Sequence, residues 1–207
     1  MKERGVDFPQ FDEAFDVLLR LNRVAKSSKE ALEEFFEING INPLFLNDAV
    51  SCVYDQVPET FSIEPHEFAL ELLQILSELH KIALVTMGHE GFQRLKMEKA
   101  GIDTRLFSKI VVTPYKNKKV IYKEMMQELD LDASEVVVCG DRIENDLTPA
   151  KELGCKTVHM RQGRGRCSPA KHADVDFSIS HLSELLPLLP KMSNLTNIIG
   201  NTLYDNQ

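Results

Sequence analysis

The sequence predicts an α/β domain built on a parallel sheet, preceded by a small helical unit. Three observations support this fold class. Short, nearly continuous apolar runs, such as residues 82–85 and 136–139, are typical of strands that are buried on both faces of a parallel sheet. Amphipathic helical patterns separate these runs, as expected for βαβ units. The first sixty residues show helical patterns with no strand pattern between them.

The helical unit is expected to contain three helices. Apolar residues at helical spacing indicate a first helix over residues 11–24. A second helix begins at Ser27-Ser28-Lys29-Glu30, which resembles a capping motif, and ends at Gly40. A third helix covers residues 46–53. The predicted organisation is therefore a helical unit over residues 1–60, an α/β core over 61–189 and a flexible tail over 190–207.

Within the core, helices and strands are expected to alternate from Pro65 onward. Pro65 favours the first turn of a helix, and Gly101 favours the end of one. Strands are expected at residues 82–85, 109–112, 136–139, 157–160 and 177–179. Helices are expected at residues 65–79, 90–100, 118–129, 142–154 and 181–186.

Composition excludes several classes of partner. A net charge of −8 and a pI near 5.3 argue against a nucleic-acid partner, because phosphate backbones attract basic surfaces. No stretch is apolar enough for a secretory signal or a membrane span. The four cysteines form no C-x-x-C pair, which favours reduced thiols in a cytoplasmic protein. A monomer or a homodimer is expected.

Polar residues follow three of the expected strands. Thr86 and Gly88 come after the first strand, Lys116 after the second, and Asp141 and Asp146 after the third. In parallel sheets, ligands bind at the carboxyl ends of the strands. A hydroxyl and a cation suit a phosphate, and two carboxylates are hard oxygen ligands for Mg²⁺. The strand ends therefore predict a site for a phosphate and a magnesium ion.

Each of these residues also has a structural interpretation. Thr86 alone would be a helix cap or a turn residue. Lys116 belongs to a lysine-rich segment, and most such lysines are solvated. Asp141 suits a strand-to-helix turn, and Asp146 suits the first turn of a helix, where it stabilises the helix dipole. Their order on consecutive strand ends favours the functional interpretation.

These motifs resemble those of the haloacid dehalogenase-like (HAD) superfamily. Residues 84–88, Leu-Val-Thr-Met-Gly, resemble its second motif, and residues 138–147, Val-Cys-Gly-Asp-Arg-Ile-Glu-Asn-Asp-Leu, resemble its fourth. Lys116 lies six residues before Tyr122, where the third-motif lysine often precedes an aromatic residue, although Lys118 competes for this assignment. The resemblance implies a three-layer Rossmann-like core, an incomplete helical cap over residues 1–60, a Mg²⁺ cofactor and a small phosphorylated substrate. It makes Thr86 and Lys116 catalytic and substrate-binding residues, Gly88 a substrate-binding residue, and Asp141 and Asp146 metal ligands.

The family's first motif has no counterpart in this sequence. In the family it is a hydrophobic strand that ends in Asp-x-Asp and lies between the strands that here end at Thr86 and Gly140. Its first aspartate attacks phosphorus. Without it, two strands are expected to face a gap whose unpaired backbone groups each cost about 1–3 kcal/mol. We therefore hypothesise a coding sequence that begins upstream of Met1, or a decayed fragment, and expect the chain as given to be inactive.

Three functional hypotheses follow. The leading one is a Mg²⁺-dependent HAD-like phosphatase whose nucleophile is missing from this chain. Dehalogenase chemistry uses the same fold and stays open as a variant of this hypothesis. The alternative is a non-catalytic phosphate- and metal-binding or regulatory module. A third, a generic doubly wound nucleotide binder, is disfavoured because neither G-x-G-x-x-G nor G-x-x-x-x-G-K-[ST] occurs.

Overall fold

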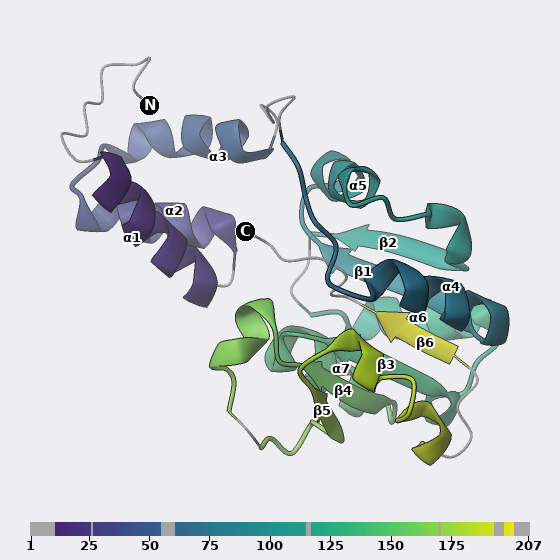
Figure 1. The fold of residues 1–207 in the computed structure, drawn as a ribbon. Coiled ribbons are helices and arrows are strands. Elements are labelled where there is room, and N and C mark those ends of the chain that lie inside the picture. Colours follow the sequence, from purple (N-terminus) through teal and green to yellow (C-terminus); the bar gives the residue numbers. More distant parts are fainter. Residues whose placement is uncertain are drawn as a thin grey trace. The chain divides into compact units, whose positions relative to one another are not determined.

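The fold was analysed in a computed structural model, which describes residues 11–25, 27–54, 61–114, 117–169, 171–192 and 197–200 (Figure 1). The chain divides into two compact units, residues 1–61 and residues 62–207. Each unit has a hydrophobic core of its own.

The first unit is helical. It contains α1 (Phe11–Val24), α2 (Ser28–Ile38), α3 (Leu46–Tyr54) and a short 3₁₀ turn at Pro43–Phe45. Ser27 caps α2, because its hydroxyl accepts a hydrogen bond from the Glu30 N–H at 3.1 Å. The apolar stripes of the helices pack on a small core of four buried residues: Leu32, Phe35, Phe36 and Ala49.

The second unit is built on a six-stranded sheet in which every pair of neighbouring strands is parallel. The strand order is β2-β1-β6-β3-β4-β5. The strands are β1 (Lys81–Met87), β2 (Lys109–Thr113), β3 (Val136–Gly140), β4 (Lys156–Met160), β5 (Phe177–Ile179) and β6 (Asn197–Gly200). The five strands expected from the sequence are present, and β6 is an addition.

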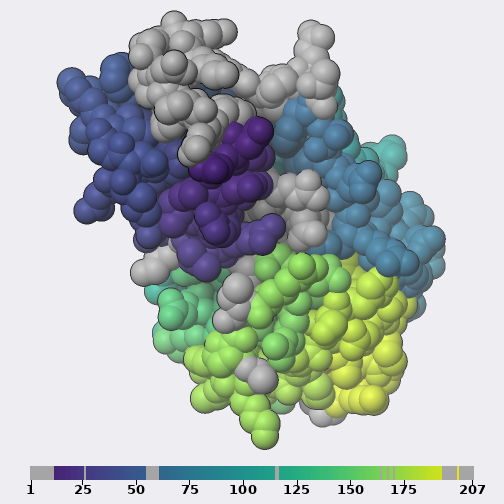
Figure 2. Space-filling view, turned by 60° about the vertical axis from the view of Figure 1, so that its left-hand side comes forward, coloured from purple at the N-terminus to yellow at the C-terminus, as the bar shows by residue number. Residues whose placement is uncertain are grey.

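Helices cover both faces of this sheet, which gives three layers. The helices are α4 (Ala69–Leu79), α5 (Glu90–Lys99), α6 (Lys119–Leu129) and α7 (Thr148–Lys151). One core joins α4 and α5 to one face, and Leu84 and Val137 belong to it. The other core joins α6 and α7 to the opposite face, through Val85 and Val138. In Figure 2, α4 (blue) lies beside the yellow segment that contains Leu182–Glu184, in agreement with contacts between them.

The centre of the sheet differs from the expectation. β6 lies between β1 and β3, and Ile198 is in register with Ile82 on one side and with Val137 on the other (Figure 1). The predicted gap is therefore filled by β6, which lies in the segment expected to be a tail, and a 3₁₀ turn at Leu189–Lys191 spans the expected start of that segment. An apolar run of two isoleucines is too short to indicate a strand, and it becomes one because two neighbours offer unpaired backbone groups.

Several helices also differ from those expected from the sequence. α4 begins at Ala69 rather than at Pro65, after Phe68 in a left-handed conformation. The helix expected after Asp141 consists of a π-helical turn at Ile143–Leu147 that continues into the short α7. The last expected helix is only a 3₁₀ turn at Leu182–Glu184. The difference at α4 lies at a helix end, whereas the other two replace most of an expected helix.

A partly buried polar network anchors β4 to the segment before β5. The Thr157 N–H donates to Asp176 Oδ2 at 3.0 Å, and the Thr157 hydroxyl donates to the Asp174 carbonyl at 2.7 Å. Lys151 forms an ion pair with Asp176. Burial raises the pKa of the Asp176 carboxyl, but the hydrogen bonds from Lys151 and Thr157 outweigh it, so the net pKa is lowered from 3.8.

This pKa shift predicts a pH-dependent contribution to stability. A carboxyl whose pKa is depressed by folding stabilises the protein above its unfolded pKa, and this stability is lost as the pH falls through the folded pKa. We therefore expect Asp176→Asn to be less stable than the wild type at neutral pH, with a difference that shrinks below about pH 3.8. Urea unfolding across this range measures the difference, with the exposed Glu124→Gln as control. A difference that stays constant with pH would contradict the prediction.

Candidate active site

The carboxyl end of β1 carries Thr86, which is 8% exposed. The Thr86 hydroxyl donates to Gln93 Oε1 at 3.2 Å. Gln93 Nε2 donates in turn to the Met87 carbonyl at 3.2 Å. Gln93 comes from the first turns of α5 and is itself buried. Thr86 therefore lies at the predicted strand end, and its hydroxyl is tied to the following helix.

Gly88 makes the turn between β1 and α5 possible. Its φ of +148° is rarely adopted by residues with a side chain, and a β-carbon there would lie 2.6 Å from Gln93 Nε2. The Gly88 N–H donates to the Thr113 carbonyl at 3.0 Å. The structure thus gives Gly88 a role in the backbone of the turn, and its predicted contact with a substrate stays a prediction.

Lys118 forms the centre of the site. Its ammonium donates to Asp146 Oδ1 at 2.7 Å and to the Val85 carbonyl at 2.9 Å, and the Lys118 and Asp146 side chains are 2% and 1% exposed. Val85 directly precedes Thr86 on β1, and Asp146 lies in the turn after β3. Lys118 therefore links the ends of β1 and β3 across the position of β6. Lys116, the predicted third-motif lysine, lies outside the described residues.

Asp141 and Asp146 follow β3. Asp141 is 8% exposed. Asp146 Oδ2 accepts the Arg142 N–H at 3.1 Å. A β-carbon at Gly140 would lie 2.7 Å from the Asp146 Cβ, so this glycine is what lets Asp146 approach the strand. The two carboxylates are thus held at one strand end, as predicted.

The site offers two carboxylates to Mg²⁺. Mg²⁺ keeps several waters and is bound in proteins by one or two carboxylates together with phosphate oxygens. Asp141 and Asp146 supply carboxylates of this kind, and each Asp146 oxygen also accepts a hydrogen bond, from Lys118 and from the Arg142 N–H. Among the described residues, no three His, Cys, Asp or Glu side chains gather as a metal-binding group. The described residues therefore fit a metal that takes its remaining ligands from water and phosphate.

His159 is a site neighbour that the sequence analysis did not identify. It pairs in register with Gly140 and is 1% exposed, and within the described part of the chain its Nε2 is buried without a hydrogen-bond partner. Burial lowers the pKa of its imidazole, so the ring is neutral at pH 7. A β-carbon at Gly165 would lie 2.1 Å from the Met160 carbonyl and 3.1 Å from His159 Nε2, so the loop after β4 packs tightly against this ring.

The thiol next to the site is inert. Cys139 lies one residue before Gly140 on β3 and is buried. Burial and the negative charges of Asp141 and Asp146 raise the pKa of its thiol to about 12. Since only the thiolate is a good nucleophile, Cys139 does not replace a missing aspartate.

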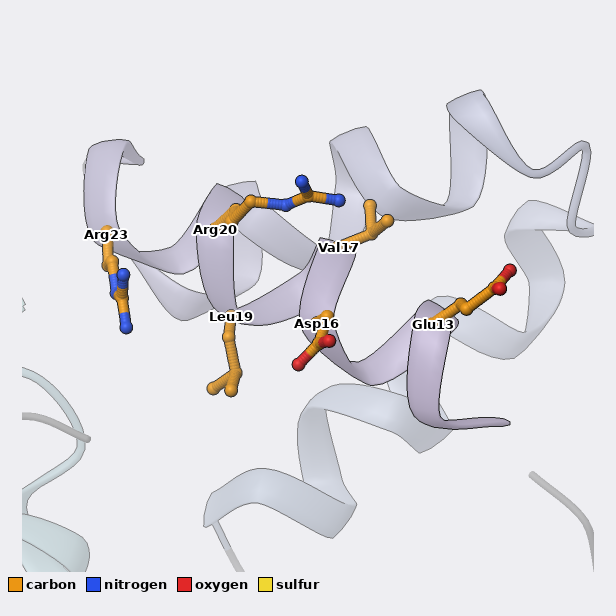
Figure 3. A pocket seen from close by; sticks show the side chains of 6 residues that line it. All are labelled: Glu13, Asp16, Val17, Leu19, Arg20 and Arg23. Carbon is orange, nitrogen blue, oxygen red and sulfur yellow. The ribbon is translucent and has the colours of Figure 1, made fainter. Parts of the chain in front are cut away.

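A cavity of about 400 Å³ lies in the other unit of the chain (Figure 3). All of its lining residues belong to α1: Glu13, Asp16, Val17, Leu19, Arg20 and Arg23. None of the strand-end residues lines it. Its acidic and basic side chains together favour neither an anionic nor a cationic ligand.

None of the helices in the part of the chain that the structure describes is long and apolar enough to cross a membrane.

Comparison with known proteins supports the resemblance seen in the motifs. Glyceraldehyde 3-phosphate phosphatase of Pyrococcus furiosus is 24% identical over 92% of this chain and 73% of its own length. The Pyrococcus abyssi enzyme of the same name is 29% identical over 46% of this chain and 42% of its own length. Phosphoglycolate phosphatase of Vibrio parahaemolyticus is 29% identical over 56% of this chain and 54% of its own length. The chain thus spans about half to three quarters of these relatives.

Solved structures agree on the fold. A HAD hydrolase from Bacillus subtilis, YfnB bound to magnesium, matches with a TM-score of 0.65 and 14% identity over 91% of this chain and 86% of that chain. A HAD phosphatase from Thermococcus onnurineus matches with a TM-score of 0.54 and 21% identity over 94% of this chain and 85% of that chain. The predicted α/β class is confirmed. The family model described as haloacid dehalogenase-like hydrolase matches residues 12–160, more than half of the sequence, and the chain therefore belongs to this family.

Proposed function

We propose that the strand-end site binds the phosphate group of a small phosphorylated metabolite together with Mg²⁺, as a phosphatase does. The observation that carries this proposal is the buried Lys118, which donates to Val85 on one side and to Asp146 on the other. An ammonium has three hydrogens, so a third donor remains. A buried cation beside a strand end is suited to an anion that approaches the carboxyl edge of the sheet.

The residues of the site have separate roles in this proposal. Lys118 offsets the negative charge of the phosphate, and the Thr86 hydroxyl donates to one of its oxygens. Asp141 is a ligand for Mg²⁺, which would neutralise charge on the phosphate when bound. Asp146 holds Lys118 in place through its Oδ1, and its predicted role as a second Mg²⁺ ligand stays part of the proposal.

Turnover needs a nucleophile, and we propose that the chain as given binds phosphate with little or no hydrolysis. β6 occupies the strand position that carries the nucleophile in the family, and its sequence, Asn-Ile-Ile-Gly, contains no aspartate. Asn201 and Thr202 follow it in the sequence. The site therefore retains the residues that bind phosphate, and it lacks the reacting carboxylate among the described residues.

The substrate class is inferred from the relatives. The names of two of them specify glyceraldehyde 3-phosphate and phosphoglycolate, which are small phosphorylated metabolites. Because this chain covers only part of those enzymes, we propose the class and no individual substrate.

Binding of inorganic phosphate, measured by calorimetry with and without Mg²⁺, tests the proposal. We expect the wild type to bind phosphate more tightly with Mg²⁺. Asp141→Asn should weaken the Mg²⁺-dependent part by more than about tenfold, because even the loss of a group that orients a metal ligand has an effect of this size. The exposed Glu124→Gln is the control and should behave as the wild type.

Two results would contradict the proposal. Absence of phosphate binding by the wild type, with Mg²⁺ present, would refute the phosphate site. Steady hydrolysis of p-nitrophenyl phosphate by the purified chain, lost in Asp141→Asn, would refute the proposed lack of turnover.

A further inference from the structure

We propose that Gln93 competes with the bound anion for the single hydroxyl hydrogen of Thr86, and so sets the affinity of the site. The inference rests on the proposed function, because it concerns phosphate binding at the same strand end. It assigns a role to a residue of α5 that donates no hydrogen bond to the anion and acts through Thr86.

The first step is the orientation of the Gln93 carboxamide. A carbonyl oxygen can only accept, so the amide must turn its NH₂ group toward the Met87 carbonyl, 3.2 Å away. This fixes Oε1 on the side of Thr86, at 3.2 Å from the hydroxyl oxygen. Oε1 has no hydrogen to give, so Thr86 must be the donor in this contact. Because the Met87 carbonyl accepts from Gln93 Nε2, the Thr86 hydroxyl is the donor and Gln93 Oε1 the acceptor in the Thr86–Gln93 hydrogen bond.

The second step is the number of hydrogens. A threonine hydroxyl has one hydrogen and two acceptor lone pairs. With that hydrogen given to Gln93, Thr86 presents only lone pairs to a ligand, and lone pairs repel a phosphate oxygen. For Thr86 to donate to the anion, the bond to Gln93 must break. Anion binding therefore includes the loss of one internal hydrogen bond.

The third step is the rigidity of the contact. Gln93 is 8% exposed, and its side chain fits into the space left by the missing side chain of Gly88. Its backbone N–H donates to the His89 carbonyl at 3.0 Å, which fixes it in the first turns of α5. Since the carboxamide is enclosed, it cannot swing away at no cost when the anion binds. The competition is thus a fixed property of the turn.

Two substitutions of similar size should shift the phosphate affinity in opposite directions. Gln93→Met removes the competing acceptor, and we expect phosphate to bind about fivefold more tightly in the presence of Mg²⁺. This change in affinity corresponds to the net free energy of one neutral hydrogen bond, and calorimetry measures it. Gln93→Glu supplies a charged acceptor, and we expect binding to weaken by about tenfold or more. Gln127→Met, at an exposed position of α6, makes the same chemical change elsewhere and should have no effect.

A double-mutant cycle shows whether the effect passes through Thr86. In a Thr86→Val background there is no hydroxyl hydrogen, so Gln93→Met should no longer change the affinity. A merely structural role of Gln93 would weaken binding in both Gln93 variants and would persist without the hydroxyl. Tighter binding by Gln93→Met that disappears in Thr86→Val supports the inference, and unchanged or weaker binding by Gln93→Met overturns it. If the wild type binds no phosphate, the proposed function fails before this comparison is reached.

Discussion

Lys118→Met should lower the free energy of unfolding by about 3–5 kcal/mol, because it leaves the Asp146 carboxylate buried without its cation. The two side chains are 2% and 1% exposed, and their atoms are 2.7 Å apart. The substitution also removes the donor to the Val85 carbonyl. Urea unfolding followed by circular dichroism measures the loss, and phosphate binding with Mg²⁺ should be abolished in the fraction that stays folded.

The chain offers a close control for this prediction. Lys119 is the next residue, and its ion pair with Glu152 lies at the surface, with side chains 43% and 51% exposed. Lys119→Met should therefore change the free energy of unfolding by no more than about 1 kcal/mol. Lys118→Met combined with Asp146→Leu should recover part of the stability lost in the single variant, because no unpaired charge is then buried. Equal effects at Lys118 and Lys119 would contradict the central position assigned to Lys118.

Gly140→Ala is the second substitution with a large expected effect. The added β-carbon would lie 2.7 Å from the Asp146 Cβ and 2.8 Å from its Oδ2. Since both β3 and the turn after it are packed in the core, relief requires Asp146 to move away from Lys118. We expect a loss of about 1–3 kcal/mol in the free energy of unfolding, as for other overpacked positions, together with weaker phosphate binding.

Gly91→Ala provides the comparison for Gly140→Ala. A β-carbon at Gly91 meets only the His89 ring, at 3.6 Å, and Gly91 lies in α5. Alanine is favoured over glycine in a helix, so this variant should be as stable as the wild type or more stable by about 0.5–1 kcal/mol. If Gly140→Ala unfolds at the same urea concentration as Gly91→Ala, the close approach of Asp146 to β3 is not needed.

The sequence predicted the positions of the candidate residues wherever the topology alone determines position. Thr86, Asp141 and Asp146 follow apolar runs that had to be strands, and parallel strands bring their carboxyl ends to one edge. Which lysine enters the site could not be read in this way. Lys116 and Lys118 differ by two residues in a polar segment, and the choice depends on where α6 begins. In the structure α6 begins at Lys119, which places Lys118 at its start and inside the site.

The side-chain contacts of the site and the central strand could not be predicted from the sequence. Gln93 lies on the buried side of a short helix and has no distinctive neighbours in the sequence. His159 reads as part of an ordinary strand, and only the register of β4 with β3 brings it to Asp141. β6 contains two apolar residues, which are too few to show the apolar pattern by which a strand is recognised in a sequence. Its position is decided by the backbone groups of β1 and β3, which sequence patterns do not describe.

The position of β6 also has a consequence for how the sheet is assembled during synthesis. β1 and β3 do not pair with each other, so among the described strands the β2-β1 pair and the β3-β4-β5 set share backbone hydrogen bonds only through β6. Of the six described strands, β6 is synthesised last, and its pairing with β1 and β3 requires contacts between segments far apart along the chain, which slow folding. Until residues 197–200 have been synthesised, the β2-β1 pair and the β3-β4-β5 set each have an open strand edge. The nascent chain is therefore most exposed to aggregation just before these residues emerge.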